Sequence, residues 1–448
     1  MKIYDFVDEG LGHSSYLIDL DDGTVALVDP ARFPTVHETL AARLGSRIAW
    51  TFDTHSHADY VTGSPGLAAR VGATFVAPAA SRLETPHHSL IDGASIDLGG
   101  GMRMVAMATP GHTPDHHAYV LQRAGDPVAL FSGGSLMVGA VGRTDLCGPE
   151  LADPLAHAMF RSLRRFDNLA DDLSVYPTHG AGSFCSAPGS SQRTTTLGDE
   201  RSANALFAIT DEDHFVTQLL AGFGTFPTYF ARLPELNRVG PRRFDTVPRL
   251  ELLGPDDIER HLATGVAVVD VRPTIGFAAG HVPGSMSNTL RPVFASWLGW
   301  LVEKDRPIAF IVDKSQDRDE IVRQCLDVGH ERLIGELAGG IDAWTASGRP
   351  VATIPIVGPN AMVGRVVDVR QANEYASGHV PGATNIELGS IATADVPTGT
   401  LTLMCGHGER AMTAASLLAA TGRSDLFVID GGPDSWSTAA RTPLETGR

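Results

Sequence analysis

Apolar and polar positions in the first half of the chain follow the patterns of alternating strands and helices. Two apolar runs, residues 16–20 and 24–28, flank an Asp-Asp-Gly turn and predict a β-hairpin. Residues 36–44 have helical spacing and stop at Gly45, and the apolar, β-rich residues 48–52 predict a buried strand. Strands that alternate with helices after an opening hairpin predict a layered α/β domain with mixed sheets.

The second half of the chain contains a repeat. Three motifs occur twice: Asp-Val-Arg at 270–272 and 368–370, Gly-His-Val-Pro-Gly at 280–284 and 378–382, and Gly-Gly-x-Asp-x-Trp at 339–344 and 431–436. An internal repeat of about 95 residues indicates two copies of one domain. Each copy predicts the order strand, turn, helix, strand, loop, helix, hence a small doubly wound α/β unit. We therefore expect an α/β multidomain chain with domains at 1–240, 246–352 and 355–448, and with residues 233–244 as a linker.

The composition and net charge of the chain limit the classes of function that it can have. A length of 448 residues fits two to four domains, and 43% hydrophobic with 19% charged residues is ordinary for a soluble globular protein. The net charge of −17 argues against nucleic acid or an anionic membrane surface as a partner, although a local basic patch can still bind a small anion. Four cysteines form no disulfide framework, the first residues lack a signal-peptide pattern, and no apolar run is long enough to span a membrane. We therefore expect a cytoplasmic protein with reduced thiols.

Histidines follow three of the predicted strands of the first half. His55 and His57, with Asp59 two residues further on, come directly after the buried strand at 48–52. His112 and His179 each follow another strand, in turns rich in glycine and proline. Imidazole suits zinc or iron, and a carboxylate can bind the metal or orient a histidine. One such histidine is more often structural, but three strand-end sites in one domain predict a metal site.

These motifs, together with Gly-Arg-Thr-Asp-Leu at 142–146 and His-Gly-Ala-Gly-Ser at 179–183, resemble the metallo-β-lactamase superfamily. Within it, residues 1–240 look most like the persulfide dioxygenase branch, which is related to glyoxalase II. The resemblance implies an αββα sandwich with its metal site at one edge between the sheets, and oxidation of a low-molecular-weight thiol persulfide to sulfite at iron(II). It also implies that Arg143 and Asp145 organise the substrate pocket, although such a pair is equally an ordinary salt bridge.

Two departures from the family pattern concern the metal. Tyr60 stands where the superfamily has a histidine of the second metal site, and Gly134 stands where it has an aspartate ligand. Without that carboxylate the facial triad that suits iron(II) is incomplete. The remaining His55, His57 and His112 would favour zinc or a weaker iron, with Asp59 or water completing the site. We therefore expect one iron(II) or zinc(II) ion.

A cysteine loop carries the chemistry of the second repeat copy. Residues 401–404 predict a buried strand, residues 411–420 predict a helix, and the loop between them reads Cys405-Gly406-His407-Gly408-Glu409-Arg410. The thiol is expected inside a ring of backbone N–H groups at a helix N-terminus, which favours the thiolate. The glycines let the backbone approach the sulfur, and the arginine can pair with an incoming anion.

With its flanking landmarks, this loop resembles that of rhodaneses, which carry sulfane sulfur as a cysteine persulfide, here on Cys405. His407 and Glu409 add little positive charge beyond Arg410, which makes thiosulfate a poor donor and favours a neutral-headed persulfide. In the first copy Asp313 stands where the cysteine should be, so that copy is expected to be catalytically silent.

Together these features predict a persulfide dioxygenase-like metal domain fused to a silent and an active rhodanese domain. Its expected partners are a low-molecular-weight thiol persulfide and sulfite or thiosulfate, and a homo-oligomer is compatible with the sequence. Two alternatives stay open for the first domain. It is either a zinc-dependent, glyoxalase II-like thioester hydrolase, or a non-catalytic part of a sulfur-carrying adaptor.

Overall fold

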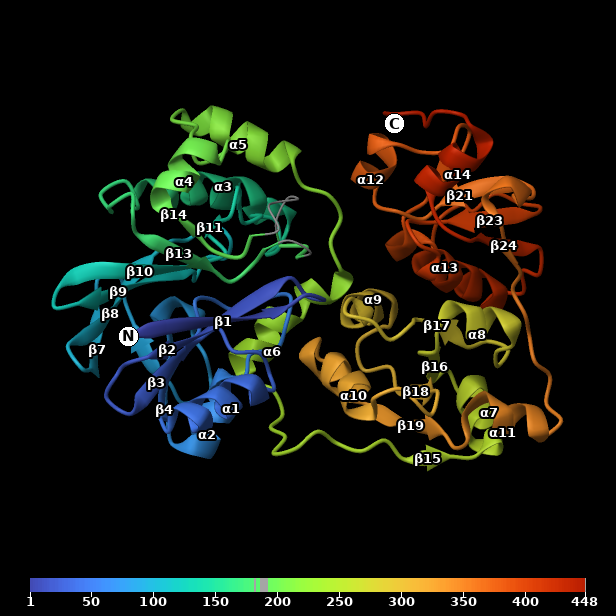
Figure 1. The fold of residues 1–448 in the computed structure, drawn as a ribbon, viewed down its shortest axis with the longest axis horizontal. Helices are drawn as coiled ribbons and strands as arrows, with labels where there is room; N and C mark the ends of the chain where they lie inside the picture. Colours follow the sequence, from blue (N-terminus) through green and yellow to red (C-terminus); the bar gives the residue numbers. More distant parts are fainter. Residues whose placement is uncertain (181–182, 186–191, 448) are drawn as a thin grey trace. The chain divides into compact units, whose positions relative to one another are not determined.

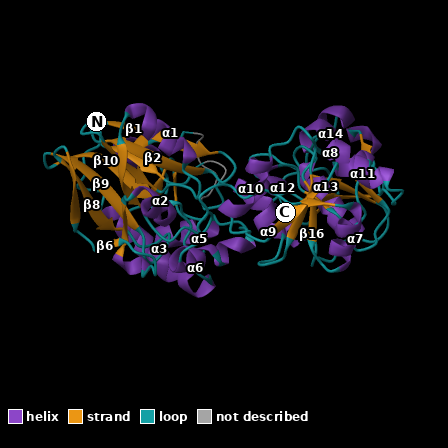
Figure 2. Cartoon of the chain, turned by 90° about the horizontal axis from the view of Figure 1, so that it is seen from below, coloured by secondary structure: helices purple, strands orange, loops and turns teal. Residues whose placement is uncertain are grey.

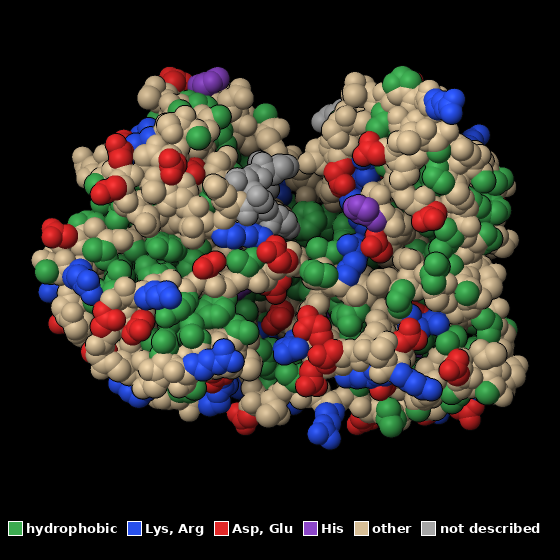
Figure 3. Space-filling model, in the orientation of Figure 1, with side chains coloured by type: hydrophobic (Ala, Val, Ile, Leu, Met, Phe, Trp, Pro, Cys, Tyr) green, Lys and Arg blue, Asp and Glu red, His purple; other side chains and the backbone are tan. Residues whose placement is uncertain are grey.

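The computed structural model of the chain describes residues 1–180, 183–185 and 192–447. It consists of two compact units, Met1–Thr246 with Leu326–Gly329, and Val247–Cys325 with His330–Arg448. Among the described residues, no helix has the length and apolar character needed to cross a membrane. On the face drawn in Figure 3, acidic and basic side chains are interspersed.

Two six-stranded sheets form the first unit (Figure 1). The first sheet has the order β1 (Lys2–Asp8), β2 (His13–Asp19), β3 (Thr24–Val28), β4 (Arg47–Phe52), β5 (Thr74–Pro78), β6 (His88–Leu90). The second has the order β14 (Thr195–Thr196), β13 (Ser174–Pro177), β10 (Asp126–Gly133), β9 (His117–Arg123), β8 (Met102–Ala108), β7 (Ser95–Gly99). Both sheets mix parallel and antiparallel pairs, because β3 to β6 and the β10–β13 pair are parallel.

Helices cover the outer faces of both sheets (Figure 1), and Figure 2 shows the same layers by element type. The helices and short elements of this unit are α1 (Thr35–Leu44), α2 (Ser64–Val71), η1 (Ala79–Ser81), β11 (Leu136–Met137), β12 (Ala140–Val141), α3 (Pro149–Arg164), α4 (Leu197–Ala203), α5 (Glu212–Ala221), η2 (Thr228–Ala231) and α6 (Leu233–Val239).

The alternation of side chains along β2 shows how the layers form. Tyr16 and Ile18 point inward to a core shared by both sheets, which includes Met104 and Phe131, whereas Leu17 points outward to the cluster under α1 and α2. Successive strand residues face opposite sides of a sheet, so one strand serves both layers. The predicted αββα sandwich is confirmed.

The second unit contains two parallel five-stranded sheets with the same strand order. The first copy has the order β15 (Leu252–Leu253), β19 (Leu333–Leu337), β18 (Ile308–Ile311), β16 (Ala267–Asp270), β17 (Met286–Ser287), with helices α7 (Pro255–Ala263), α8 (Thr274–Ala279), α9 (Phe294–Leu301), α10 (Arg318–Asp327) and α11 (Gly340–Ala346). The second has the order β20 (Ile356–Val357), β24 (Leu426–Ile429), β23 (Leu401–Met404), β21 (Arg365–Asp368), β22 (Thr384–Asn385), with η3 (Pro359–Ala361), α12 (Ala372–Ser377), η4 (Leu388–Ser390), α13 (Glu409–Ala420) and α14 (Pro433–Ala440). The predicted internal repeat is therefore present in the fold.

The repeated Asp-Val-Arg motif has the same structural role in each copy. Arg272 donates through Nε and Nη2 to the carboxylate of Asp270, and its Nη2 also donates to the carbonyl of Gly280. Arg370 makes the equivalent bonds to Asp368. Both aspartates are fully buried, so the motif joins the end of a central strand to the Gly-His turn.

The expected linker at 233–244 is wrong in its first half. Residues Leu233–Val239 form α6, in which Leu233 and Asn237 are buried within the first unit. The side chain of Asn237 accepts from the N–H of Thr62 and donates to the carbonyls of His57 and Tyr60. The segment therefore supports the loop that follows the histidine pair. The three expected domain boundaries stay predictions.

Candidate functional site

The predicted metal residues converge at one edge of the two sheets of the first unit. His55, His57 and Asp59 follow β4, His112 lies in the turn between β8 and β9, and His179 follows β13. All five are buried, at most 2% exposed. Strand β4 belongs to one sheet, whereas β8, β9 and β13 belong to the other. These side chains therefore come together only when the two sheets pack.

Three imidazole rings of this cluster have the spacing of ligands around one ion. The ring centroids of His55 and His112 are 5.0 Å apart, those of His112 and His179 are 5.2 Å apart, and those of His55 and His179 are 5.5 Å apart. Rings bound through nitrogen to one tetrahedral zinc ion have centroids about 5.2 Å apart, given zinc–nitrogen bonds of about 2.0–2.1 Å. The centroid distances are therefore compatible with a single ion.

Hydrogen bonds fix the tautomer of His55. The Thr54 hydroxyl donates to Asp29 Oδ2 at 2.8 Å, so its oxygen is left to accept from His55 Nδ1, also at 2.8 Å. His55 Nε2 then carries a lone pair, and it lies 3.5 Å from Nε2 of His179. Two nitrogens on one tetrahedral zinc ion are about 3.3 Å apart.

His179 and His112 each have Nδ1 next to an oxygen atom, but only His112 makes a hydrogen bond there. His179 Nδ1 lies 3.2 Å from a carboxylate oxygen of Asp59, and His112 Nδ1 donates to the carbonyl of Arg143 at 2.9 Å. Burial lowers the pKa of His112 to about 3, which keeps its imidazole neutral. Its Nε2 is buried without a hydrogen-bond partner among the described residues. The Asp59 carboxylate lies beside His179 without a hydrogen bond to it, and Nε2 of His112 is available for a metal.

His57 has a different environment from the other histidines. Its Nε2 contacts Asp29 Oδ1 at 3.2 Å and the Tyr60 hydroxyl at 3.0 Å, and Tyr60 stacks on its ring. Burial alone would lower the pKa of His57, but the charge of Asp29 and the bond with it raise that pKa. Its metal-binding atom still lies within 4.8 Å of those of His55 and His179. Sequence reasoning grouped His57 with His55 and His112, whereas the ligand atoms group His57 with His55 and His179, and His112 with His179 and Cys185.

Gly134 leaves the expected carboxylate position without a side chain, and His112 fills the space. A Cβ built on Gly134 would lie 2.3 Å from Cδ2 and 2.8 Å from Nε2 of His112. The N–H of Gly134 donates to Nε2 of His116 at 2.9 Å. No other carboxylate replaces the missing one here, since the Asp59 carboxylate is next to His179 Nδ1. The local packing is therefore adapted to glycine.

Arg143 and Asp145 form a bidentate ion pair. Arg143 Nε and Nη2 lie 2.7 Å and 2.8 Å from the two carboxylate oxygens of Asp145, and Nη2 also donates to the carbonyl of Gly224. The guanidinium lies over the ring of Phe226, 4.4 Å from its centroid. Arg143 is 3% exposed, so the geometry favours the salt-bridge interpretation of this pair.

The Cys405 loop has the expected arrangement around the sulfur. Cys405 follows β23 and is 1% exposed, and the backbone N–H of Gly408 donates to its Sγ at 3.1 Å. Gly408 has a φ of +103°, a left-handed conformation that suits glycine, and α13 begins at the next residue. His407 is exposed on this loop and Gly406 is half-buried. The loop thus directs a backbone donor and a helix N-terminus at the thiol.

Arg410 differs from expectation because its charge is already paired. Its two terminal nitrogens donate to the two carboxylate oxygens of Glu374 at 2.7 Å and 2.8 Å. Burial acts to raise the pKa of Glu374, but the bond and charge of Arg410 lower it, so the carboxylate stays ionised. Sequence reasoning missed Glu374, which lies 36 positions before its partner.

The first repeat copy adds residues to the surroundings of Cys405. Arg291 is half-buried, and burial lowers its pKa while the charges of Glu409 and of a Cys405 thiolate raise it. Trp297, on α9, has its ring 5.9 Å from the guanidinium carbon of Arg410. No local motif marks these residues, so only the packing of the two copies identifies them.

The equivalent loop of the first copy is held by hydrogen bonds from its own side chains. Arg318 donates to the backbone carbonyls of Asp313 and Gln316 and to the carboxylate of Glu336. Gln316 Oε1 accepts from the N–H of Asp313. A carboxylate cannot carry sulfane sulfur, so this geometry agrees with a silent copy.

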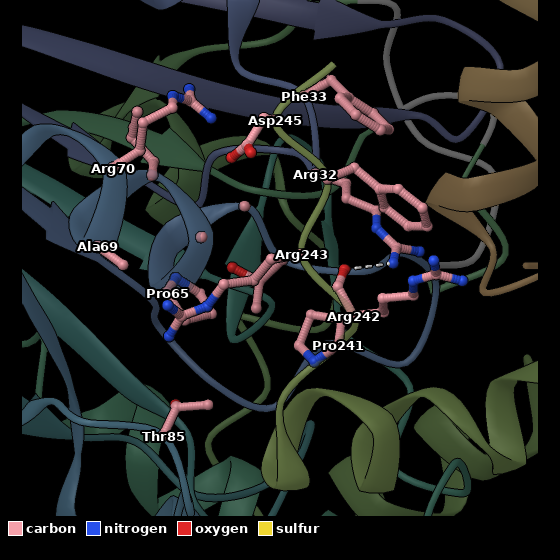
Figure 4. Close-up of a pocket in the computed structure, with 15 residues that line it drawn as sticks. Arg32, Phe33, Pro65, Ala69, Arg70, Thr85, Pro241, Arg242, Arg243 and Asp245 are labelled. Carbon is pink, nitrogen blue, oxygen red and sulfur yellow. Dashed lines mark hydrogen bonds between the residues drawn. The ribbon is translucent and has the colours of Figure 1, made fainter. Parts of the chain in front are cut away.

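A basic cavity of about 170 Å³ lies elsewhere in the first unit (Figure 4). Arg32, Arg70, Arg242 and Arg243 line it, and the dashed line marks the bond from Arg32 to the carbonyl of Arg242. Phe244 supplies an apolar wall against which Arg32 and Arg242 stack. In a chain of net charge −17, this is the kind of local basic patch that can accept a small anion.

Comparisons with known proteins agree with this architecture. The metallo-beta-lactamase superfamily model matches residues 8–179, and the rhodanese-like domain model matches residues 254–347 and 358–439. Hydroxyacylglutathione hydrolase of Acidiphilium cryptum is 31% identical over 215 residues, which are 43% of this chain and 85% of that protein. The same-named protein of Methylococcus capsulatus is 35% identical over 159 residues, and the chain spans only 57% of its length.

Two further relatives extend the comparison. Human mitochondrial persulfide dioxygenase ETHE1 is 29% identical over 202 residues, which are 44% of this chain and 73% of that protein. A crystal structure of a metallo-beta-lactamase from Staphylococcus aureus subsp. aureus COL has a TM-score of 0.67 and 25% identity, and covers 75% of this chain and 99% of its own.

Proposed function

The chain belongs to the metallo-β-lactamase superfamily and carries two rhodanese-like domains. We propose that it transfers sulfane sulfur through a persulfide on Cys405. The family context places the chain in sulfur metabolism, and the proposal adds the residue and the substrates. The observation that carries it is the Cys405 loop, where the Gly408 N–H donates to Sγ at the start of α13. The other copy has Asp313 at the corresponding place.

The proposed reaction has two steps. The Cys405 thiolate attacks the outer sulfur of a low-molecular-weight thiol persulfide, which forms a Cys405 persulfide and releases the thiol. Sulfite then attacks the outer sulfur of that persulfide, which forms thiosulfate and returns the thiolate. Gly408 N–H stabilises the negative sulfur in the resting enzyme and as the second leaving group.

Thiosulfate formation from a thiol persulfide and sulfite tests the proposal. Cys405→Ser should abolish it, whereas Cys147→Ser, which changes a half-buried loop thiol of the first unit, should leave it unchanged. Asp313→Ala should also leave the rate unchanged in a folded protein. Substantial transfer by Cys405→Ser, or its loss in Asp313→Ala, would refute the assignment.

We further propose that the first unit holds one ion, and that zinc fits better than iron(II). The support is a set of clustered imidazoles without the carboxylate of an iron facial triad. A bound zinc ion would either stabilise the fold or act as a Lewis acid, whereas a bound iron(II) ion would support reactions with oxygen. Relatives carry both a hydrolase and a dioxygenase name. Metal analysis, with thioester turnover and persulfide-dependent oxygen uptake measured on the same sample, separates these alternatives from a non-catalytic domain.

A further inference from the structure

The cluster lacks an anionic ligand of the kind that the family has at position 134. Imidazole ligands alone leave the charge of a divalent ion uncompensated, and the nearby Asp59 carboxylate is next to His179 Nδ1 rather than Nε2. Restoring an aspartate at 134 is sterically blocked, because the ring of His112 occupies that space. A different anionic donor is therefore needed if the site is to be neutralised.

A thiol lies at the required place. Cys185 is fully buried, and its sulfur and the metal-binding atoms of His112 and His179 all lie within 4.8 Å of one another. Nitrogen and sulfur ligands of one tetrahedral zinc ion are about 3.6 Å apart, given bonds of about 2.0–2.1 Å and 2.3 Å. A shift of about 1 Å or less brings the thiol into the coordination sphere.

An independent observation also points to a ligand. His112 Nε2 has no hydrogen-bond partner among the described residues although it is fully buried and oriented by its Nδ1 bond. Leaving a buried polar atom without a partner costs about 1–3 kcal/mol, which a metal bond would offset.

One residue couples the thiol to this histidine. The backbone N–H of Arg143 donates to the carbonyl of Cys185 at 3.0 Å, and the carbonyl of Arg143 accepts from His112 Nδ1 at 2.9 Å. The side chain of Arg143 is itself held by Asp145. Both donors are thus positioned by one fixed peptide segment, which is how an outer residue pre-organises metal ligands.

We propose that Cys185 is a metal ligand that replaces the lost carboxylate and binds the ion together with His112 and His179. The thiol loses its proton on binding, so the thiolate supplies the missing negative charge. Two nitrogens and one sulfur from these residues leave one position of a tetrahedral zinc ion for a further donor. The inference rests on the proposed single ion, and it names the anionic ligand of that ion.

Protein in a Cys405→Ser background, which removes the other reactive thiol, is reconstituted with zinc or cobalt(II). X-ray absorption at the zinc edge should show one sulfur at about 2.3 Å. The cobalt protein should have a near-ultraviolet thiolate-to-metal charge-transfer band. Cys185→Ser should lose that band and weaken zinc binding by more than the about 10–100-fold effect of losing an orienting partner. Cys147→Ser should keep both properties.

The outcomes separate the two proposals. One zinc per chain with only nitrogen and oxygen neighbours, retained in Cys185→Ser, would overturn the role of Cys185 and leave the single ion in place. No stoichiometric metal in reconstituted protein would overturn both. If Cys185→Ser fails to fold, the absorption spectrum of the background protein still decides whether sulfur is bound.

Discussion

Gly134→Ala adds one carbon at the point where the His112 ring is closest to the backbone. The new Cβ would lie 2.3 Å from Cδ2, 2.7 Å from Cγ and 2.8 Å from Nε2 of that ring. Carbon atoms attract best at about 3.5–4.0 Å, so the ring must move by about 1 Å or more. The movement breaks or strains the bond from His112 Nδ1 to Arg143 and takes Nε2 away from its place.

Two energetic effects follow, and they can be measured separately. Overpacking of this kind costs about 1–3 kcal/mol, and it acts on the metal-free protein. Displacement of a ligand weakens zinc binding. Each tenfold loss of zinc affinity removes about 1.4 kcal/mol of the stability that excess zinc contributes. The destabilisation by Gly134→Ala should therefore be larger in saturating zinc than in a chelator.

Denaturant unfolding in zinc and in chelator gives both values, alongside zinc affinity by competition with a chromophoric chelator. Gly66→Ala in α2 is the matched control, because a Cβ there meets nothing within 4 Å. This control should raise stability by about 0.5–1 kcal/mol in both conditions, since alanine is the better helix former. If Gly134→Ala keeps wild-type zinc affinity, His112 is not a ligand and the metal model fails.

Three further predictions concern the supporting residues. Arg291→Ala should lower kcat/KM for persulfide transfer about tenfold, equivalent to about 1.4 kcal/mol, whereas Arg291→Lys should retain most of it, as steady-state kinetics will show. Glu374→Gln should free the charge of Arg410 and lower KM for thiosulfate more than KM for a neutral-headed persulfide. Asn237→Ala should destabilise the first unit by about 1–3 kcal/mol in chelator, because three buried backbone groups lose their partner, and thermal unfolding measures this.

The local sequence pattern was sufficient to predict the helices and strands that carry the chemistry. The strand before Cys405 was predicted at 401–404 and is found as Leu401–Met404, and the helix that ends at Gly45 is Thr35–Leu44 with that glycine at φ +67°. These signals work because strand and helix periodicity, and the freedom of glycine, act within a few residues. The same applies to the His55 motif, whose strand and turn are contiguous.

Contacts between segments that lie far apart in the sequence could not be predicted from local patterns. Asn237 was assigned to a linker because its segment is short and ends in glycine and proline, yet it bonds to a loop about 180 positions earlier. The vacancy at Gly134 was visible in sequence, but not that His112 fills it. From the sequence alone, an aspartate at position 134 looks acceptable. The packing predicts instead that it would displace His112.

The charges around Cys405 bear on which donor the enzyme prefers. Arg410 is paired with the ionised Glu374, and Arg291 lies within electrostatic reach of both Glu409 and the thiolate. The two arginines are balanced by Glu374 and Glu409, so these side chains give the pocket no net positive charge. Thiosulfate is a dianion, so its approach is opposed at a half-buried site where the effective dielectric constant is low. A persulfide with a neutral head brings less negative charge into the pocket. The pairing of Arg410 with Glu374 thus disfavours thiosulfate as the sulfur donor.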